Sequence, residues 1–194
     1  MSDAAPEHPG YTFGPSALAT PANAITVARL LAAPVYVLML VAWGASWVNV
    51  VVGFLLAASD GLDGHVARKH GTTRSGAFLD PLADKAVVLG ALFTLAAQGH
   101  LPWLPVGLIA AREAGMQGYR SWVGRSGISI PARPTAKVKT FVQDLAVGVC
   151  IIPPLAHQHD LQLAMIWFAC ALTLYTGAEY LLDGRRAMHE RAAS

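Results

Sequence analysis

Hydrophobic and polar residues along this chain fall into long blocks, not into the short alternation of a half-buried strand. Six apolar stretches recur, and each could form a helix of about 20 residues, the length needed to cross the hydrocarbon core of a membrane. They cover approximately residues 24–44, 47–68, 77–98, 102–123, 137–156 and 161–182. The pattern predicts an all-α, polytopic membrane protein with six transmembrane helices packed as a bundle.

Composition supports this fold class. Hydrophobic residues make up 54% of the 194 residues, charged residues only 13%, and the mean hydropathy is +0.44, whereas an average soluble domain carries about 25% charged residues. Residues 1–20 lack the basic start and apolar core of a signal peptide, so we expect a flexible or interfacial cytoplasmic tail. Residues 21–184 are then a single six-span domain, followed by a basic cytoplasmic tail at 185–194.

Positive charge is distributed unevenly over the predicted connections. All 14 Lys and Arg residues lie on one side of the six-span arrangement, whereas the connections at 43–47, 98–103 and 155–162 contain none. Because basic residues are retained on the cytoplasmic side, this distribution predicts an integral membrane protein with both termini in the cytoplasm.

Four carboxylates interrupt the second and third apolar stretches. Asp60 and Asp63 are three residues apart and Asp80 and Asp84 are four apart, so each pair lies on one face of its helix. An ionised side chain at bilayer depth costs at least about 2.5 kcal/mol, which makes these residues candidates for a functional site. An all-oxygen set suits two Mg²⁺ or Mn²⁺ ions. An intramembrane cation carrier is an alternative, although the acids cluster toward one face instead of following a path across the membrane.

The four aspartates belong to a longer motif that carries a family resemblance. Its eight fixed positions are Asp60, Asp63, Gly64, Ala67, Arg68, Gly76, Asp80 and Asp84. Their spacing resembles the signature of the CDP-alcohol phosphatidyltransferase family at every fixed position. The resemblance extends from about Pro21 to Asp183.

Roles for the motif residues follow from the resemblance. It implies that Asp60, Asp63, Asp80 and Asp84 hold two metal ions, and that Asp84 is also the catalytic base that takes a proton from an acceptor hydroxyl. It assigns binding of the CDP-lipid to Gly64, Ala67, Arg68, Gly76 and Asn23. It also implies a homodimer in contact with membrane lipids, with no nucleic acid partner.

Further residues resemble the branch of this family that forms phosphatidylglycerophosphate and CMP from CDP-diacylglycerol and sn-glycerol 3-phosphate, a step of phospholipid biosynthesis. They occur in the segments Asn23-x2-Thr26-x2-Arg29, Ala111-Arg112-Glu113 with Arg120, and Lys137-x-Lys139-Thr140. The acceptor phosphate would be bound by Arg112, Arg120, Lys137 and Thr26.

Simpler interpretations of these cations stay open. They also fit the positive-inside distribution, and Glu113 could pair with one of them. Lys139, Arg125 and Arg133 are expected to be solvated. Within the same chemistry, the alternatives are a cardiolipin synthase that uses phosphatidylglycerol and an inositol phosphate phosphatidyltransferase, which the aspartate motif does not separate.

Overall fold

The computed structural model describes residues 21–70, 74–125 and 134–193. All regular secondary structure in these ranges is helical, which confirms the all-α prediction. The helices are α1 (Pro21–Trp43), α2 (Trp47–His70), α3 (Arg74–Ala97), α4 (Trp103–Arg125), α5 (Pro134–Ile151) and α6 (His159–Ala193). Each overlaps one predicted apolar segment, whereas the tail predicted at 1–20 lies outside the described residues.

Two helix ends differ from the prediction. Helix α5 stops at Ile151 instead of 156, because Pro153 and Pro154 follow and proline neither donates a helical hydrogen bond nor tolerates a helical residue before it. Helix α6 has 35 residues and continues to Ala193. The residues assigned to a separate C-terminal tail therefore extend the last helix as far as that position.

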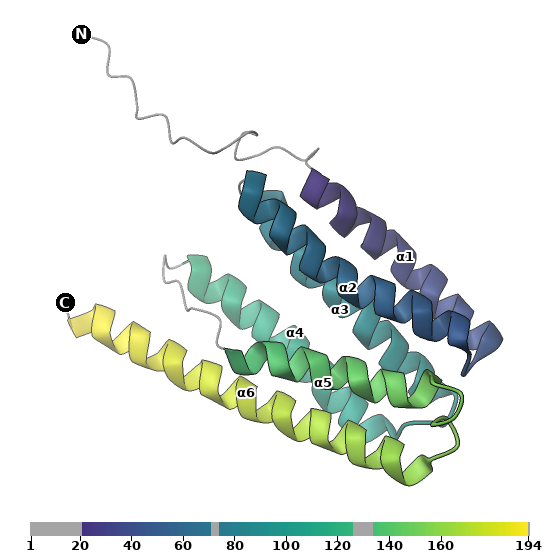
Figure 1. Ribbon diagram of the computed structural model, residues 1–194. Helices are drawn as coiled ribbons and strands as arrows, with labels where there is room; N and C mark the ends of the chain where they lie inside the picture. The colour runs from purple at the N-terminus through teal and green to yellow at the C-terminus, as the bar shows by residue number, and fades with distance from the viewer. Residues whose placement is uncertain (1–20, 71–73, 126–133, 194) are drawn as a thin grey trace.

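The helices run alternately up and down, so the chain ends and connections sort into two ends of the bundle (Figure 1). The loop end holds the connections α1–α2, α3–α4 and α5–α6. The charged end holds the starts of α1, α3 and α5 and the ends of α2, α4 and α6. Helix α1 packs mainly on α3 and also on α2, whereas α3 and α6 each pack against both α4 and α5. The basic segments of the sequence therefore meet at the charged end.

Glycines in left-handed conformations end two helices at the loop end. Gly44 has φ +54° and its N–H donates to the carbonyl of Leu40 at 3.0 Å; Gly99 has φ +81° and follows the end of α3. After Gly99, the N–H of His100 donates back to the carbonyl of Leu95 at 3.0 Å. These are the backbone arrangements that satisfy the last carbonyls of a helix, and glycine adopts them without steric cost.

Side-chain amides complete this end of the molecule. Asn49 is fully buried, and its Nδ2 donates to the carbonyls of Gly44 at 2.7 Å and Met39 at 3.2 Å. Gln162, also buried, donates to the carbonyl of Ala156 at 2.8 Å. Such bonds remove the cost of burying carbonyls that no helical N–H can reach.

Apolar side chains fill the bundle between these connections and its middle. Leu40, Leu92, Ile109 and Ile166 are the largest of them and are at most 1% exposed. We refer to these four residues as the loop-end core. They come from α1, α3, α4 and α6, so the loop-end core ties both sides of the bundle together.

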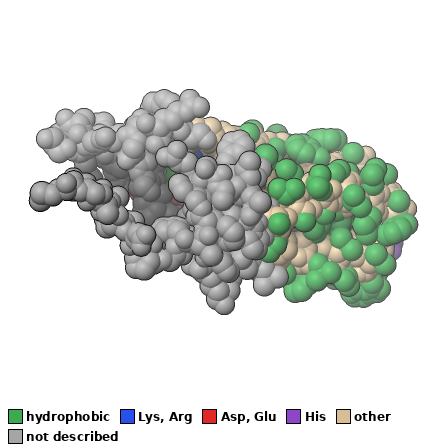
Figure 2. All heavy atoms as spheres, turned by 90° about the horizontal axis from the view of Figure 1, so that it is seen from above, with side chains coloured by type: hydrophobic (Ala, Val, Ile, Leu, Met, Phe, Trp, Pro, Cys, Tyr) green, Lys and Arg blue, Asp and Glu red, His purple; other side chains and the backbone are tan. Residues whose placement is uncertain are grey.

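The outer surface is also apolar. Leu31, Phe54 and Phe141 expose 66–71% of their surface, and hydrophobic side chains spread over the coloured part of the face shown in Figure 2. Surfaces of this kind contact membranes or other proteins. Ala24–Trp43 and His159–Arg185 are long and apolar enough to cross a membrane. In α2 and α3 the apolar stretches found are shorter, so the structure supports a membrane-embedded helical protein without establishing six spans.

Candidate active site

The four motif aspartates occupy matching levels of two antiparallel helices. Asp60 lies ten residues before the end of α2 at His70, and Asp84 lies ten residues after the start of α3 at Arg74. At 1.5 Å per residue, both are about 15 Å from the charged end. The backbone thus brings the two acid pairs to one depth of adjoining helices.

The side chains of the predicted metal ligands and CDP-lipid residues lie outside the part of the structure that describes side chains. This holds for Asp60, Asp63, Asp80 and Asp84 and for Asn23, Gly64, Ala67, Arg68 and Gly76. Their roles stay predictions. Among the side chains that are described, no three His, Cys, Asp or Glu residues come together as a metal site.

A buried arginine contacts the residue that precedes the motif. Arg29 in α1 is 3% exposed, and its Nε donates to Ser59 Oγ at 3.1 Å. Ser59 Oγ in turn donates to the carbonyl of Leu56 at 2.7 Å. Because Ser59 is the chain neighbour of Asp60, this contact joins α1 to α2 where the acid pairs begin.

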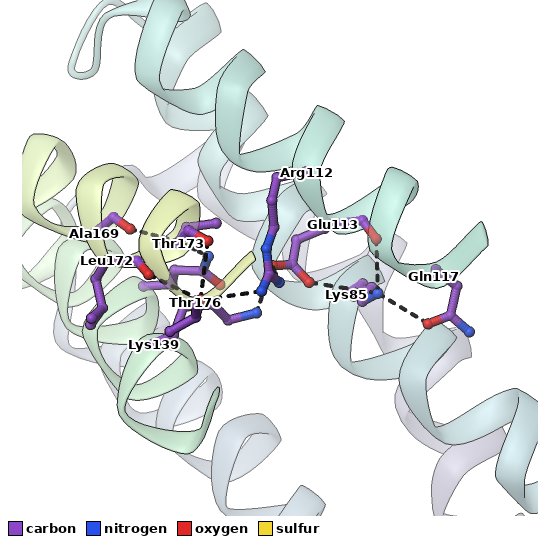
Figure 3. A network of polar contacts seen from close by, with 10 residues as sticks. Lys85, Arg112, Glu113, Gln117, Lys139, Ala169, Leu172, Thr173 and Thr176 are labelled. Carbon is purple, nitrogen blue, oxygen red and sulfur yellow. Dashed lines mark hydrogen bonds and ion pairs between the residues drawn. The ribbon is translucent and has the colours of Figure 1, made fainter. Parts of the chain in front are cut away.

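On the other side of the motif, three cations surround one carboxylate. Glu113 Oε1 accepts from Lys139 Nζ at 2.5 Å and from Arg112 Nη1 at 2.7 Å, and Glu113 Oε2 lies 3.6 Å from Lys85 Nζ (Figure 3). The exposed fraction of the Glu113 side chain is 5%, and those of Lys139 and Arg112 are 8% and 14%. We call these four residues the cationic cluster. Three positive charges and one negative charge leave a formal excess of two.

Lys85 also joins α3 to α4 through neutral acceptors. Its Nζ donates to the carbonyl of Glu113 and to Gln117 Oε1, both at 3.1 Å. Lys85 directly follows Asp84, the residue with which the family resemblance associates proton transfer. The cationic cluster is therefore anchored beside the aspartate motif.

Helix α6 holds the far end of the Arg112 side chain. Arg112 Nη2 donates to Thr176 Oγ1 at 3.2 Å (Figure 3). A Cβ atom placed on Gly177 would lie 2.9 Å from Arg112 Nε and 3.3 Å from its Cγ. Any larger residue at 177 would therefore displace the Arg112 side chain, whose buried Nε has no hydrogen-bond partner among the described residues.

The remaining predicted acceptor residues lie outside these contacts. Arg120 is exposed, and its Cζ lies 5.8 Å from the centre of the Tyr180 ring, so Arg112 and Arg120 both contact α6. Lys137 is exposed on α5, and Thr26 is 1% exposed on α1.

The prediction that Lys139 is solvated is wrong. The structure buries Lys139 and pairs it with Glu113, which compensates the desolvation of its charge. The side chains of Arg125 and Arg133, which were expected to be solvated as well, are not among those described.

The open interpretation that Glu113 pairs with one of the predicted acceptor cations is confirmed for Arg112. Three other residues of this site, Lys85, Thr176 and Gly177, were missed. Lys85 is a charge within an apolar stretch, which is a usable signal, but 28 residues separate it from Glu113. Thr176 and Gly177 carry no signal in the sequence, since threonine and glycine are common in apolar helices. The contacts of Thr176 and Gly177 with Arg112 become visible only in the structure, where α4 packs against α6.

Comparisons with known proteins test the family resemblance. The sequence profile of the CDP-alcohol phosphatidyltransferase family matches residues 19–175. A probable phosphatidylglycerophosphate synthase of Mycobacterium tuberculosis is 38% identical over 183 residues, covering 91% of this chain and 87% of that protein. The CDP-diacylglycerol–glycerol-3-phosphate 3-phosphatidyltransferases of Rickettsia bellii and Haemophilus influenzae are each 30% identical; both alignments cover 81% of this chain and respectively 91% and 89% of the relatives.

The match to the family profile covers the aspartate motif, Arg112 and Lys139, and ends just before Thr176. The family predicted from the spacing of the aspartates is confirmed. This chain belongs to the CDP-alcohol phosphatidyltransferase family.

Proposed function

We propose that this protein transfers the phosphatidyl group of CDP-diacylglycerol to sn-glycerol 3-phosphate, yielding phosphatidylglycerophosphate and CMP. Membership of the family supports a phosphatidyltransferase, and the names of the relatives support this donor and acceptor. The observation that carries the choice of acceptor is the cationic cluster, a buried site with a formal excess of two positive charges next to the aspartate motif.

The charge of the cluster complements the acceptor. A phosphate monoester carries about 1.5 to 2 negative charges at neutral pH. Among the described contacts, Arg112 uses one N–H on Nη1 and one on Nη2, which leaves a second N–H on each nitrogen for a ligand. Hydrogen bonds between ionised partners are about twice as strong as neutral ones. Arg112 and Lys139 are therefore the main acceptor residues in this proposal, with Arg120, Lys137 and Thr26 as further candidates.

The donor set fits a pair of hard divalent cations. Asp60, Asp63, Asp80 and Asp84 are all-oxygen ligands on two helices at matched depth, and they would hold two Mg²⁺ or Mn²⁺ ions. When bound, such ions neutralise negative charge on the diphosphate and on the departing CMP.

The chain's own residues account for the other steps. Asp84 accepts the proton of the acceptor hydroxyl, whose oxygen bonds to the phosphorus of the phosphatidyl group as the bond between that phosphorus and the CMP oxygen breaks. Arg68, with Gly64, Ala67, Gly76 and Asn23, would bind the CDP-lipid. Lys85 fixes the turn of α3 that carries Asp84 against α4, next to Arg112.

The same proposal includes a membrane arrangement. All six helices would span the bilayer with both termini in the cytoplasm, since the basic segments meet at the charged end. A homodimer follows from the family resemblance, and its mass can be measured in detergent by light scattering.

The test is release of CMP by the purified full chain with CDP-diacylglycerol and Mg²⁺ or Mn²⁺, comparing sn-glycerol 3-phosphate, phosphatidylglycerol and inositol phosphate as acceptors. Release that depends on sn-glycerol 3-phosphate is expected, and chelation of the metal should abolish it. Preference for another acceptor would overturn the proposed acceptor. Absence of release with all three would contradict the enzyme assignment and favour a cation carrier.

A further inference from the structure

The Arg112 side chain of the cationic cluster is restrained at three of its atoms. Glu113 binds one terminal nitrogen at 2.7 Å, Thr176 binds the other at 3.2 Å, and Gly177 packs against Nε. Contacts from two helices therefore fix both the position and the plane of the guanidinium. A fixed plane matters because arginine binds phosphate through donors in a rigid fork.

Thr176 is itself oriented by α6. Its hydroxyl lies 2.9 Å from the carbonyl of Leu172 and 3.0 Å from that of Thr173, and it donates back to these acceptors. Because the O–H hydrogen is directed into its own helix, an oxygen lone pair remains for Arg112. Thr173, three residues earlier, repeats the arrangement: it donates to Ala169 at 2.6 Å and accepts from Gln143 at 2.8 Å.

Glu113 restrains the other cations. Its carboxylate accepts from Lys139 and lies near Lys85, and its backbone carbonyl accepts from Lys85. Because three buried like charges repel strongly at short range, they stay together only around a shared counter-ion. Glu113 supplies a negative charge that Arg112, Lys139 and Lys85 share.

We propose that Glu113, Thr176 and Gly177 are positioning residues for the acceptor, which hold Arg112 in the orientation that receives its phosphate. This inference rests on the proposed function. It gives α6 a part in acceptor selectivity, although the family motif lies on α2 and α3. None of the three residues needs to touch the acceptor, since each acts through the guanidinium of Arg112.

The experiment compares variants that loosen Arg112 from the α6 side. Thr176→Val removes the acceptor oxygen and keeps the shape, and Gly177→Ala places a methyl group against Nε. Each should raise the KM for sn-glycerol 3-phosphate by about 5- to 20-fold, less than the loss of a direct hydrogen bond to a charged group because Arg112 itself remains. The KM for CDP-diacylglycerol should stay within about twofold. Thr176→Ser, which keeps the hydroxyl, should retain the wild-type KM.

Two controls separate positioning from a general loss of structure. Gln162→Met removes a buried hydrogen bond from the loop end of the same helix, so it should lower the melting temperature without altering either KM. In an Arg112→Gln background, Thr176→Val should add less than about a twofold increase, because its effect passes through Arg112. Glu113→Gln should raise the acceptor KM further than Thr176→Val and also lower the melting temperature.

The inference would be overturned if the α6 variants changed the KM values for sn-glycerol 3-phosphate and CDP-diacylglycerol equally. It would also be overturned if Thr176→Val had its full effect in the Arg112→Gln background. Failure of the proposed function has a different signature: the wild-type protein itself would release no CMP in the presence of sn-glycerol 3-phosphate. The α6 variants leave the charges around Glu113 unchanged, so they decide the question even if Glu113→Gln proves unstable.

Discussion

The cationic cluster and the loop-end core are both buried, yet different forces hold them. The loop-end core consists of Leu40, Leu92, Ile109 and Ile166, and the buried amides beside it are neutral and bonded to backbone carbonyls. In the cationic cluster, three cations share one carboxylate. Close van der Waals packing between helices gains free energy within a membrane, whereas a buried ion pair roughly offsets its own desolvation. The comparison indicates that the loop-end core supplies stability and that the cationic cluster is retained for its chemistry.

The largest effect is expected at the aspartate motif, beside the cluster. Asp84→Asn should lower kcat by about 10²- to 10⁴-fold, because an amide cannot take the acceptor proton. Binding of CDP-diacylglycerol should persist, as measured by its protection against thermal unfolding. Asp160→Asn, at an exposed site of the loop end, is the matched control and should keep its activity. Turnover by Asp84→Asn at the wild-type rate would remove Asp84 as the base.

The loop-end core should show the opposite response. Leu92→Ala should destabilise the protein by about 2–5 kcal/mol, since it leaves a cavity at a fully buried site, while both KM values stay unchanged. Thermal unfolding in detergent measures the loss. Leu104→Ala, on a side chain that is 63% exposed, should have little effect. If Leu92→Ala shifted the acceptor KM, the separation between the two regions would be incomplete.

Variants of two arginines of α4 separate a residue of the cationic cluster from an exposed residue on the same helix. Arg112→Gln should raise the KM for sn-glycerol 3-phosphate by about 10- to 100-fold, because Arg112 is a charged donor whose side chain is only 14% exposed. Arg120→Gln should raise it by about threefold or less, since Arg120 is exposed and stacks on Tyr180. Steady-state kinetics with each substrate varied in turn distinguish them. Equal effects of the two variants would argue against a buried acceptor pocket.

The smallest effect is expected where helices end at the loop end of the bundle. Gly99→Ala should cost about 1–2 kcal/mol, because alanine resists the left-handed conformation of this residue. Gly107→Ala, in an open position within α4, should be neutral or stabilise by up to about 1 kcal/mol. Melting temperatures compare the pair, and a similar loss in both would show that φ is not the cause.

Much of the fold could be predicted from the sequence because helix formation is local. Each of the six apolar stretches corresponds to one helix in the described part of the chain. The error at the end of α5 came from Pro153 and Pro154, whose effect is itself local. The aspartate motif was found for the same reason, since its spacing repeats within two neighbouring helices.

The cationic cluster could be predicted only in part, as a possible pairing of Glu113 with Arg112, because the rest of it depends on tertiary packing. Lys85, Glu113 and Lys139 are separated by 28 and 26 residues and come from three helices. In the sequence, Lys139 looks like a solvated lysine on the cytoplasmic side. Only the packing of α5 against α3 and α6 shows that it reaches Glu113. Thr176 becomes informative only once α4 and α6 are seen in contact.

The position of Glu113 between its partners has a consequence for how the protein is made. Lys85 precedes Glu113 in the chain and Lys139 follows it, so α3 and α4 can neutralise part of each other's charge before α5 has been synthesised. When Lys139 arrives, a carboxylate is already in place to receive it. The order of residues along the chain thus lets Lys139, the last of these charged residues to be synthesised, meet a carboxylate that is already present on α4.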